Sequence, residues 1–237
     1  MLSLRRCLAS TPVVGRICNS LSSALRSSRR RFAGSASYWE QRYREGGNSG
    51  VGSYGEFCRF KAKFLNQFVV RQGIRTIIEF GCGDGNQLSM ASYPRYLGFD
   101  ISRTAVELCR SRFRDDPTKS FALMSEYAGQ RADLVLSLDV IFHLVEDDVF
   151  EQYMRRLFRA AARYIVIYSS NCDSVETAAG PHVRHRAFTE WVGREIADWG
   201  LSAQVPNAYP YRGDYRTGSF SDFFVYELSG TADVAAA

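Results

Sequence analysis

A glycine-rich turn directly after a short apolar run is the feature that most constrains this chain. The run Thr76–Phe80 has the β-branched, apolar composition of a buried strand. Glycines then alternate at positions 81, 83 and 85, and glycine lets a backbone turn tightly and approach a ligand closely. In a doubly wound sheet such a turn lies at the carboxyl ends of the strands, where ligands bind. The sequence therefore predicts a ligand site at this turn.

Strand-like and helix-like segments alternate after residue 75, which is typical of a mostly parallel sheet with helices on both faces. We expect strands at 76–80, 96–100, 120–124, 132–138, 164–168, 201–205 and 220–228. Helices are expected at 104–113, from residue 146 onward, and over 188–199, where Trp199 completes the apolar spacing. The pattern predicts one α/β domain over residues 73–230, followed by a disordered tail at 231–237.

Residues 1–37 form a predicted N-terminal presequence. The first 39 residues carry seven arginines and no Lys, Asp or Glu, and they are rich in Ser and Ala. This composition is typical of an organellar transit peptide, and residues 29–33 (RRRFA) resemble a mitochondrial processing site. We therefore predict a disordered transit peptide and a mitochondrial location. A plastid or cytoplasmic location, and a basic tail with no targeting role, are the alternatives.

The net charge of +5 comes from that presequence. Without its arginines the chain has 23 basic against 25 acidic residues. A near-neutral body does not favour nucleic acid or an anionic membrane as a partner. The apolar runs are also far shorter than the ~20 residues of a transmembrane helix. The cysteines show no C-x-x-C spacing, so the sequence predicts neither a disulfide framework nor a metal site.

Residues 38–72 form a predicted N-terminal lid and helix. Tyr38, Trp39 and Tyr43 precede a glycine-rich loop at 46–52. Ser53 and Glu56 have the spacing of a capping box. Apolar residues at 57, 60, 64, 65 and 68 then give the following helix one apolar face. The three aromatic residues either cover the ligand site or pack the N-terminal helix on the sheet.

Two cofactor classes use a glycine turn with an acid, here Asp100, at the end of the next strand. A dinucleotide site needs G-x-G-x-x-G. The sixth position is Asn86 when the motif starts at Gly81 and Leu88 when it starts at Gly83, so neither start fits. The pattern E-x-G-x-G-x-G from Glu79 to Gly85 instead resembles that of class I S-adenosylmethionine-dependent methyltransferases. The resemblance extends over the predicted domain, through Asp100, the strand running into residues 137–143 and the terminal pair of strands. It implies a Rossmann-like, seven-stranded, mostly parallel sheet whose last strand is antiparallel.

The resemblance also implies a cofactor, S-adenosyl-L-methionine, and residues that contact it. Glu79 would bind the amino group, Asp100 would hold the ribose, and Ile101 would pack beside the adenine. Ser125 or Glu126 is a candidate for the adenine edge. The full set of implied cofactor residues is Glu79, Gly81, Cys82, Gly83, Gly85, Asp100, Ile101 and Asp139. The stretch 85–96 is short for the family's first helix, which suggests a trimmed element. The segment from Tyr38 to Ala62 resembles a subgroup of these enzymes found mainly in bacteria.

Candidate catalytic residues are His143 and Asp139, which follow the fourth strand together with Phe142. Methyl transfer is an in-line displacement that depends mainly on alignment, and a base is needed only when the acceptor must lose a proton.

Candidate substrate residues are Tyr168, Asn171, His182 and His185. No carboxylate accompanies the last two histidines, so a metal is not predicted. If the basic loop 182–186 faces the substrate, an anionic acceptor is the natural expectation.

Three functions follow from these observations. The first is a methyltransferase acting on a small molecule. The second is a methyltransferase acting on a protein or on RNA. The third is an organellar assembly or binding factor that has the fold without turnover. The intact motif argues against a degenerate site, and the absence of an N-P-P-Tyr tetrad after the fourth strand disfavours methylation of DNA amines. The acceptor and the oligomeric state are not defined by the sequence.

Overall fold

The computed structural model describes residues 32–173 and 180–229, and the chain from Gly34 onward forms one compact unit. The expected presequence and tail lie outside the described residues, apart from the last residues of the range 1–37. There the first described helix, α2 (Ser35–Arg44), begins three residues before the expected boundary at residue 38. The expected lid segment belongs to the same compact unit as the sheet.

Seven strands form a single sheet in the order β3-β2-β1-β4-β5-β7-β6. The strands are β1 (Ile77–Phe80), β2 (Tyr96–Asp100), β3 (Lys119–Leu123), β4 (Ala132–Leu138), β5 (Ala161–Ser169), β6 (Trp199–Val205) and β7 (Asp222–Leu228). The first five pair in parallel, whereas β7 is antiparallel to both β5 and β6. This confirms the predicted Rossmann-like sheet with an antiparallel last strand. Because β1 and β4 lie at the centre, the glycine turn after β1 is enclosed by neighbouring strands.

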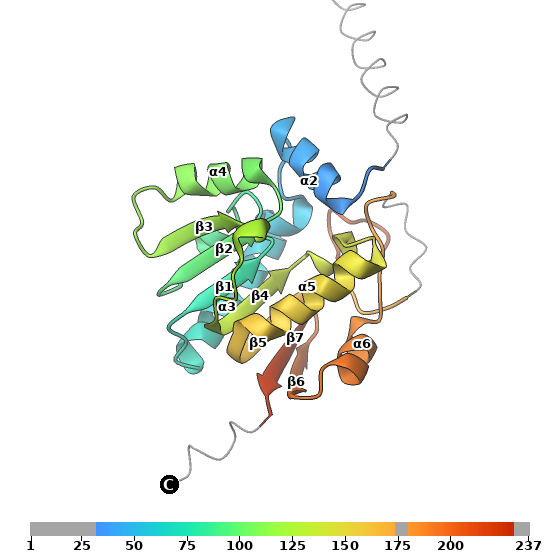
Figure 1. Ribbon diagram of the computed structural model, residues 1–237. Coiled ribbons are helices and arrows are strands. Elements are labelled where there is room, and N and C mark those ends of the chain that lie inside the picture. The colour runs from blue at the N-terminus through green and yellow to red at the C-terminus, as the bar shows by residue number, and fades with distance from the viewer. Residues whose placement is uncertain (1–31, 174–179, 230–237) are drawn as a thin grey trace, which may run out of the picture. The chain divides into compact units, whose positions relative to one another are not determined.

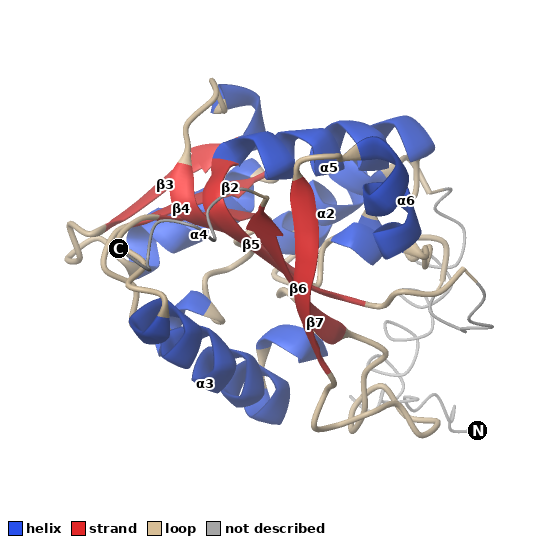
Figure 2. Ribbon diagram, turned by 90° about the horizontal axis from the view of Figure 1, so that it is seen from below, coloured by secondary structure: helices blue, strands red, loops and turns tan. Residues whose placement is uncertain are grey.

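Helices cover both faces of the sheet (Figure 1). The remaining helices are α3 (Gly55–Arg71), α4 (Arg103–Arg112), α5 (Asp147–Ala160) and α6 (Phe188–Glu195). One apolar cluster joins α3 and α4 to one face, through residues such as Leu65 and Val106. The other cluster joins α5 and α6 to the opposite face, through Met154 and Trp191. Figure 2 shows α3 on the side of the sheet opposite to α5 and α6. None of the described helices is long and apolar enough to cross a membrane.

The connection from β1 to β2 contains only one short 3₁₀ turn, η2 (Leu88–Met90). This agrees with the predicted trimming of the element after the glycine motif. The space on this side of the sheet is filled by α3, whose Cys58 carbonyl accepts a hydrogen bond from Gln87 at 3.2 Å. The N-terminal segment therefore takes over part of the packing that a longer crossover helix would supply.

Two local predictions are wrong. Ser53 does not cap α3: it ends the 3₁₀ turn η1 (Val51–Ser53), Tyr54 is the N-cap without a side-chain bond, and the Ser53 carbonyl binds Asn86 at 2.7 Å. Trp199 does not belong to α6, which ends at Glu195. It begins β6 and packs edge-on against Phe158 at 5.7 Å. The helical spacing of apolar residues continues by chance into β6, so periodicity alone predicted a helix longer than α6.

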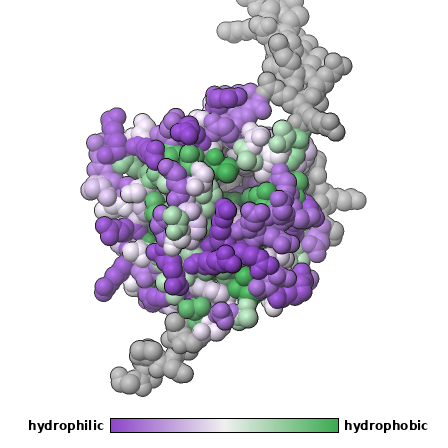
Figure 3. Space-filling view, viewed as in Figure 1, coloured by the Kyte–Doolittle hydropathy of each residue, from purple (hydrophilic) through white to green (hydrophobic). Residues whose placement is uncertain are grey.

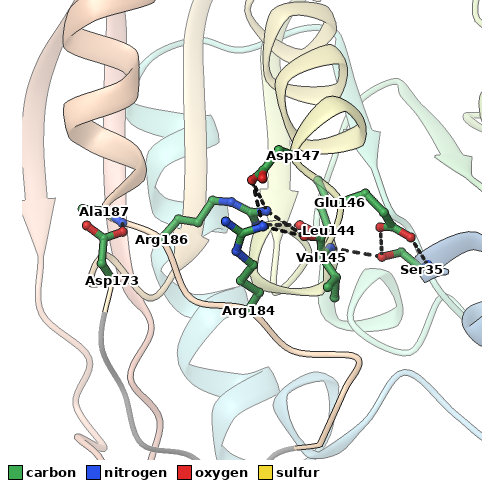
Figure 4. A network of polar contacts seen from close by, with 9 residues as sticks. All are labelled: Ser35, Leu144, Val145, Glu146, Asp147, Asp173, Arg184, Arg186 and Ala187. Carbon is green, nitrogen blue, oxygen red and sulfur yellow. Dashed lines mark hydrogen bonds and ion pairs between the residues drawn. The ribbon is translucent and has the colours of Figure 1, made fainter. Parts of the chain in front are cut away.

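Helix α2 is tied to two separate parts of the sheet's edge. The Glu40 carboxylate accepts hydrogen bonds from the Ser102 and Thr104 hydroxyls at 2.7 and 2.9 Å, at the start of α4. At its other end, Ser35 bonds to Glu146 through its amide at 2.9 Å and its hydroxyl at 2.6 Å (Figure 4). These contacts hold α2 across the turns that follow β2 and β4, as Figure 1 shows.

Candidate active site

The first two motif glycines occupy backbone conformations that other residues rarely adopt. Gly81 has φ +86° and Gly83 has φ +58°, values in the left-handed region that glycine enters without steric penalty. A Cβ on Gly81 would lie 2.4 Å from a methyl group of Val140, and one on Gly83 would lie 2.3 Å from the Ser49 hydroxyl. The turn is therefore packed closely against the segments that follow β4 and α2.

The third glycine has a different role. Gly85 has φ +74°, and a Cβ there would lie 2.8 Å from the Phe113 ring and 3.0 Å from the Cys109 sulfur. Gly85 does not line the cavity beside the motif. The structure thus places Gly85 against the end of α4 and does not place it with the other residues expected to contact the cofactor.

A cavity, here called the motif cavity, opens at the carboxyl ends of β1, β2 and β4. Seven of the eight expected cofactor residues line it: Glu79, Gly81, Cys82, Gly83, Asp100, Ile101 and Asp139. Ile101 and Val149 are partly exposed and contribute apolar surface to this cavity. Figure 3 shows apolar side chains at the surface between α4 and α5. The cavity thus combines carboxylates at its base with apolar side chains along its wall.

Two buried carboxyl groups lie at the base of the motif cavity. Burial raises the pKa of Glu79 to about 7, against the lowering effect of a 2.7 Å hydrogen bond from the Tyr96 hydroxyl. Burial likewise raises the pKa of Asp100 to about 6, although the amides of Gly83 and Ser102 each donate to it at 2.9 Å. In the described part of the chain no basic side chain forms an ion pair with Glu79. A cationic ligand group beside Glu79 would stabilise its ionised form.

Asp139 and Lys61 form a buried ion pair between the motif cavity and α3. The Lys61 ammonium lies 2.5 Å from Asp139 Oδ2, and its side chain is 1% exposed. The other carboxylate oxygen, Oδ1, accepts a hydrogen bond from the Ser221 hydroxyl at 3.3 Å. Asp139 has φ +58°, a left-handed conformation that Asp tolerates better than most residues. Through these two contacts Asp139 links α3 to the segment before β7 and holds both at the edge of the motif cavity.

A second cavity, here called the aromatic cavity, adjoins the first and has a volume of about 300 Å³. Trp39, Ser49, Asp139 and His143 line both cavities. Its walls come from α2, the loop before α3, the segments after β4 and β5, and the β6–β7 connection. Three of the four expected substrate residues line it, namely Tyr168, His182 and His185, as does Phe142.

His143 lies at the junction of the two cavities and is held as a neutral imidazole. Burial lowers its pKa to about 3. Its Nδ1 lies 3.0 Å from the His182 carbonyl oxygen, which can only accept a hydrogen bond. Nδ1 therefore carries the proton, and Nε2 carries the free lone pair. The Trp39 ring packs edge-on against the imidazole at 4.8 Å and fixes its plane.

Other expected site residues have structural roles. Asn171 lines neither cavity, because its side chain bonds to the Thr189 hydroxyl and amide at the start of α6. The basic loop does not present its arginines to the aromatic cavity. Arg184 and Arg186 bind Asp147, and Arg184 also binds the Val145 carbonyl (Figure 4). The expectation of an anionic acceptor rested on this loop. Because its arginines are engaged elsewhere, they do not support that expectation.

The adenine-edge candidates also fall outside the motif cavity. The Glu126 carboxylate accepts a hydrogen bond from the Leu123 amide at 2.6 Å, and neither Ser125 nor Glu126 is among the lining residues. Met124 lines the cavity instead, with Tyr153 from α5. The wall beside Ile101 is therefore built from apolar and aromatic side chains.

Two site residues were missed by the sequence analysis. Lys61 stands four residues after Phe57 and four before Leu65, on the buried face of α3, and a lysine on such a face was the available signal. Gln87 lines the motif cavity, and its Oε1 is buried with no hydrogen-bond partner among the described residues. A single glutamine after a glycine motif carries no periodic or motif signal that would have identified it.

The N-terminal segment covers the glycine motif, as expected of a lid. Asp84 in the motif accepts hydrogen bonds from the Ser49 amide at 3.0 Å and the Tyr54 hydroxyl at 2.7 Å. Its own amide donates to the Ser49 hydroxyl at 2.9 Å. These bonds lower the pKa of Asp84 even though partial burial opposes them. The Tyr43 hydroxyl lies 3.0 Å from the same Ser49 oxygen, so α2 and its loop are fastened directly over the turn.

The methyltransferase domain family matches residues 77–163, the stretch that contains the glycine turn, Asp100 and the segment after β4. This match and the sheet order together show a chain with the Rossmann-like methyltransferase fold. The methyltransferase domain of a bacterial Hen1 protein (CtHen1) is 17% identical, with a TM-score of 0.55 over 72% of this chain and 98% of that one. No curated protein sequence matches the chain.

Two further solved structures have the same fold at low identity. Magnesium protoporphyrin IX methyltransferase (ChlM) from Synechocystis PCC 6803, with bound SAH, is 14% identical, with a TM-score of 0.59 over 82% of this chain and 98% of that one. The mitomycin 7-O-methyltransferase MmcR is 14% identical, with a TM-score of 0.52 over 66% of this chain and 50% of that one. At these identities the likeness concerns the fold, and the acceptor has to be inferred from the site.

Proposed function

We propose that this chain is an S-adenosylmethionine-dependent methyltransferase that binds its cofactor in the motif cavity and a small-molecule acceptor in the aromatic cavity. The observation that carries the proposal is the meeting of the two cavities at Asp139 and His143. A group-transfer enzyme needs two sites whose contents touch at one point. Here that point lies directly beside the glycine motif.

The motif cavity fits the cofactor in charge and in shape. Buried Glu79 lacks a basic ion-pair partner in the described chain, so it can bind an ammonium group, and the unpartnered Gln87 Oε1 can accept a hydrogen bond nearby. Each Asp100 oxygen accepts one backbone hydrogen bond and retains capacity for a ribose hydroxyl. Ile101 and Met124 offer apolar surface for a purine ring.

S-adenosylmethionine supplies a methyl group on a positively charged sulfur, and its transfer to a protic acceptor leaves S-adenosylhomocysteine, the methylated acceptor and one proton. In this site His143 is the group that can receive that proton, at Nε2, because Nδ1 is already bonded to the His182 carbonyl. Asp139 holds α3 and the segment before β7 around the same point through Lys61 and Ser221. Its role is to position the site.

A small acceptor is supported by the way the aromatic cavity is covered. Residues of α2 and of the loop before α3 form one of its walls, and hydrogen bonds to Asp84 fasten this loop to the glycine motif. A side chain on a folded protein or a paired RNA strand would have to displace this cover. Two methyltransferases of the same fold, ChlM and MmcR, are named for small-molecule acceptors.

The proposal is tested by calorimetric titration of the full chain with S-adenosylmethionine and, separately, with NAD. We expect micromolar binding of S-adenosylmethionine alone, and loss of that binding in Asp100→Ala. Asn171→Ala, which alters a side chain outside both cavities, is the matched control and should bind normally. Failure of S-adenosylmethionine to bind the folded wild-type chain would rule out the proposed function and favour a non-catalytic role.

For the location of the protein we propose the mitochondrion, on the composition of residues 1–37. A fusion of residues 1–39 to a fluorescent protein tests this. Mitochondrial fluorescence is expected, and replacing the arginines of this segment by glutamine should abolish it. A diffuse cytosolic or a plastid signal from the unaltered fusion would contradict the proposal.

A further inference from the structure

The lining of the aromatic cavity is unusually rich in rings. Seven of its twenty lining residues are Phe, Trp or Tyr, which make up 14% of the whole chain, and three more are histidines. The rings come from separate segments that meet only in the folded protein. They are Tyr38, Trp39, Phe57, Phe142, His143, Tyr168, His182, His185, Tyr215 and Phe220. Flat ring faces at about van der Waals distance favour a flat ligand, because offset stacking adds to the burial of apolar area.

The two charged side chains that line this cavity are engaged in other contacts, and Asp139 is the one in an ion pair. Among its described lining residues only Arg42 and Asp139 carry a formal charge. Arg42 Nε donates to the Asn48 carbonyl at 2.6 Å, and its guanidinium lies 5.6 Å from the centre of the Trp39 ring. Asp139 is bonded to Lys61 and Ser221. A carboxylate or phosphate in this cavity would lose its hydration and would have to draw Arg42 away from Asn48 and Trp39 to gain a cationic partner.

The three histidines of the chain all line the aromatic cavity, and all are neutral at physiological pH. Burial lowers the pKa of His143, His182 and His185. The charge of Arg42 also contributes to this lowering for His143 and His182. The His182 ring lies parallel to that of Tyr38 at 4.3 Å and to that of His143 at 5.6 Å. These rings stack on one another and add no net charge to the cavity.

Two imidazole nitrogens are left for a polar group on the ligand. His143 Nε2 is an acceptor, because Nδ1 donates to the His182 carbonyl. His185 Nδ1 is bonded to the Ser170 hydroxyl at 2.6 Å, and its Nε2 is buried with no partner among the described residues. A buried polar atom without a partner is costly, by about 1–3 kcal/mol. A bound hydroxyl group can satisfy such a nitrogen.

We propose that the aromatic cavity binds a neutral, flat aromatic compound that carries a hydroxyl group and donates that hydroxyl to His143 Nε2. The inference rests on the proposed function, because it names the class of acceptor for the same site. It excludes phosphorylated or carboxylated acceptors and saturated alcohols. Transfer to this class breaks the bond between sulfur and the methyl carbon and forms an oxygen–carbon bond, while the hydroxyl proton goes to His143 Nε2 and from there to water.

Four matched probes test the class by calorimetry on the full chain: 2-naphthol, 2-naphthyl phosphate, decahydro-2-naphthol and naphthalene. We expect 2-naphthol to bind at least tenfold more tightly than each of the others. Decahydro-2-naphthol removes the flatness and naphthalene removes the hydroxyl group. The phosphate replaces the hydroxyl group and adds negative charge, so its comparison with naphthalene shows the effect of charge. Tighter binding of the phosphate or the saturated alcohol, or no binding of 2-naphthol at millimolar concentration, would overturn the inference.

Two variants locate the binding. His143→Phe should reduce the preference for 2-naphthol over naphthalene to less than threefold, and Phe220→Leu should weaken 2-naphthol binding by about fivefold to tenfold. For Phe220→Leu, which lies outside the motif cavity, unchanged S-adenosylmethionine affinity would show that the fold is intact. For His143→Phe, which lines both cavities, an unchanged midpoint of urea unfolding would show it. Wild-type affinity for 2-naphthol in both variants would place the probe elsewhere and overturn the inference. Each titration is run with and without S-adenosylhomocysteine. A chain that binds no cofactor but still prefers 2-naphthol would contradict the proposed function alone.

Discussion

The motif cavity and the aromatic cavity share a wall but are built on different physical principles. The base of the motif cavity is formed by residues at the ends of parallel strands and holds the ionisable groups Glu79 and Asp100, while α2, α3 and α5 complete its walls. The aromatic cavity is formed by side chains from dispersed segments, and its polar groups are neutral histidines or paired charges. The first is suited to a charged ligand with fixed hydrogen bonds, and the second to a flat neutral one. Four predictions test this contrast, from the largest expected effect to the smallest.

The Lys61–Asp139 ion pair, which lies between the cavities, should support ligand binding in both of them. Asp139→Asn keeps a residue that tolerates the left-handed backbone but leaves buried Lys61 without its anion. Breaking a buried pair in this way costs about 3–5 kcal/mol. We expect that loss in urea unfolding, with weaker binding of both S-adenosylmethionine and 2-naphthol. The double variant Lys61→Met/Asp139→Asn, which leaves no unpaired charge, should recover most of the stability. A double variant as unstable as the single one would show that the charge is not the cause.

Binding to the two cavities should depend differently on pH. Glu79, with a pKa of about 7, is ionised above that pH and can then bind an ammonium group. S-adenosylmethionine affinity should therefore fall roughly tenfold between pH 7.5 and pH 6. Affinity for 2-naphthol should change less than twofold, because His143, which would accept its hydroxyl proton, has a pKa of about 3 and stays neutral over this range. Calorimetric titrations at both pH values measure the two affinities.

Glu79→Gln is the control for that difference. It should weaken cofactor binding by about tenfold to a hundredfold at pH 7.5, as expected for a lost charged hydrogen bond of about 1.5–3 kcal/mol. It should also leave only the smaller pH dependence that comes from Asp100, whose pKa is about 6. In the cofactor-free protein, stability depends on pH in the opposite direction to cofactor affinity. The raised pKa of Glu79 means that its favourable contribution to stability is complete below about pH 4.5 and is lost as the pH rises through 7. Wild type should therefore lose stability relative to Glu79→Gln over this range.

The glycines of the motif should separate binding from stability. Gly83→Ala would bring a methyl group against the Ser49 hydroxyl, so we expect weaker cofactor binding, by about tenfold, as the cover over the turn shifts, together with a loss of stability from its positive φ. Gly85→Ala would press against Phe113 and Cys109 instead. It should cost about 1–3 kcal/mol of stability through backbone strain and overpacking, with cofactor affinity unchanged in the folded fraction. Equal loss of affinity in both variants would contradict the division of roles.

The smallest effect is expected outside both cavities. Arg184 binds Asp147 and the Val145 carbonyl, and its side chain is 47% exposed. Arg184→Gln should change stability by less than about 1 kcal/mol, in keeping with exposed ion pairs, and leave the binding of every probe unchanged. A selective loss of 2-naphthyl phosphate binding in this variant would show instead that the loop recognises an anion.

The sequence by itself determined the sheet and the base of the motif cavity, because both follow from local rules. A β-branched run fixes a strand, alternating glycines fix the turn after it, and an acid at the end of the next strand lies beside that turn in any parallel pair. Seven of the eight residues expected around the cofactor line one cavity for this reason. Gly85 departs from the pattern because its neighbours in α4 are set by helix packing, which the motif does not encode.

Only the tertiary structure decided how Lys61 pairs with Asp139, how the N-terminal segment is fastened over the turn, and which side chains face the acceptor. Lys61 and Asp139 are 78 residues apart, and the rings of the aromatic cavity come from residues 38 to 220. No periodicity or spacing links such positions. Arg184 and Arg186 looked available to a substrate in the sequence, but their partners at the start of α5 lie close only in the folded chain. Contacts between distant segments depend on where whole helices and loops pack, and that packing is a property of the complete fold.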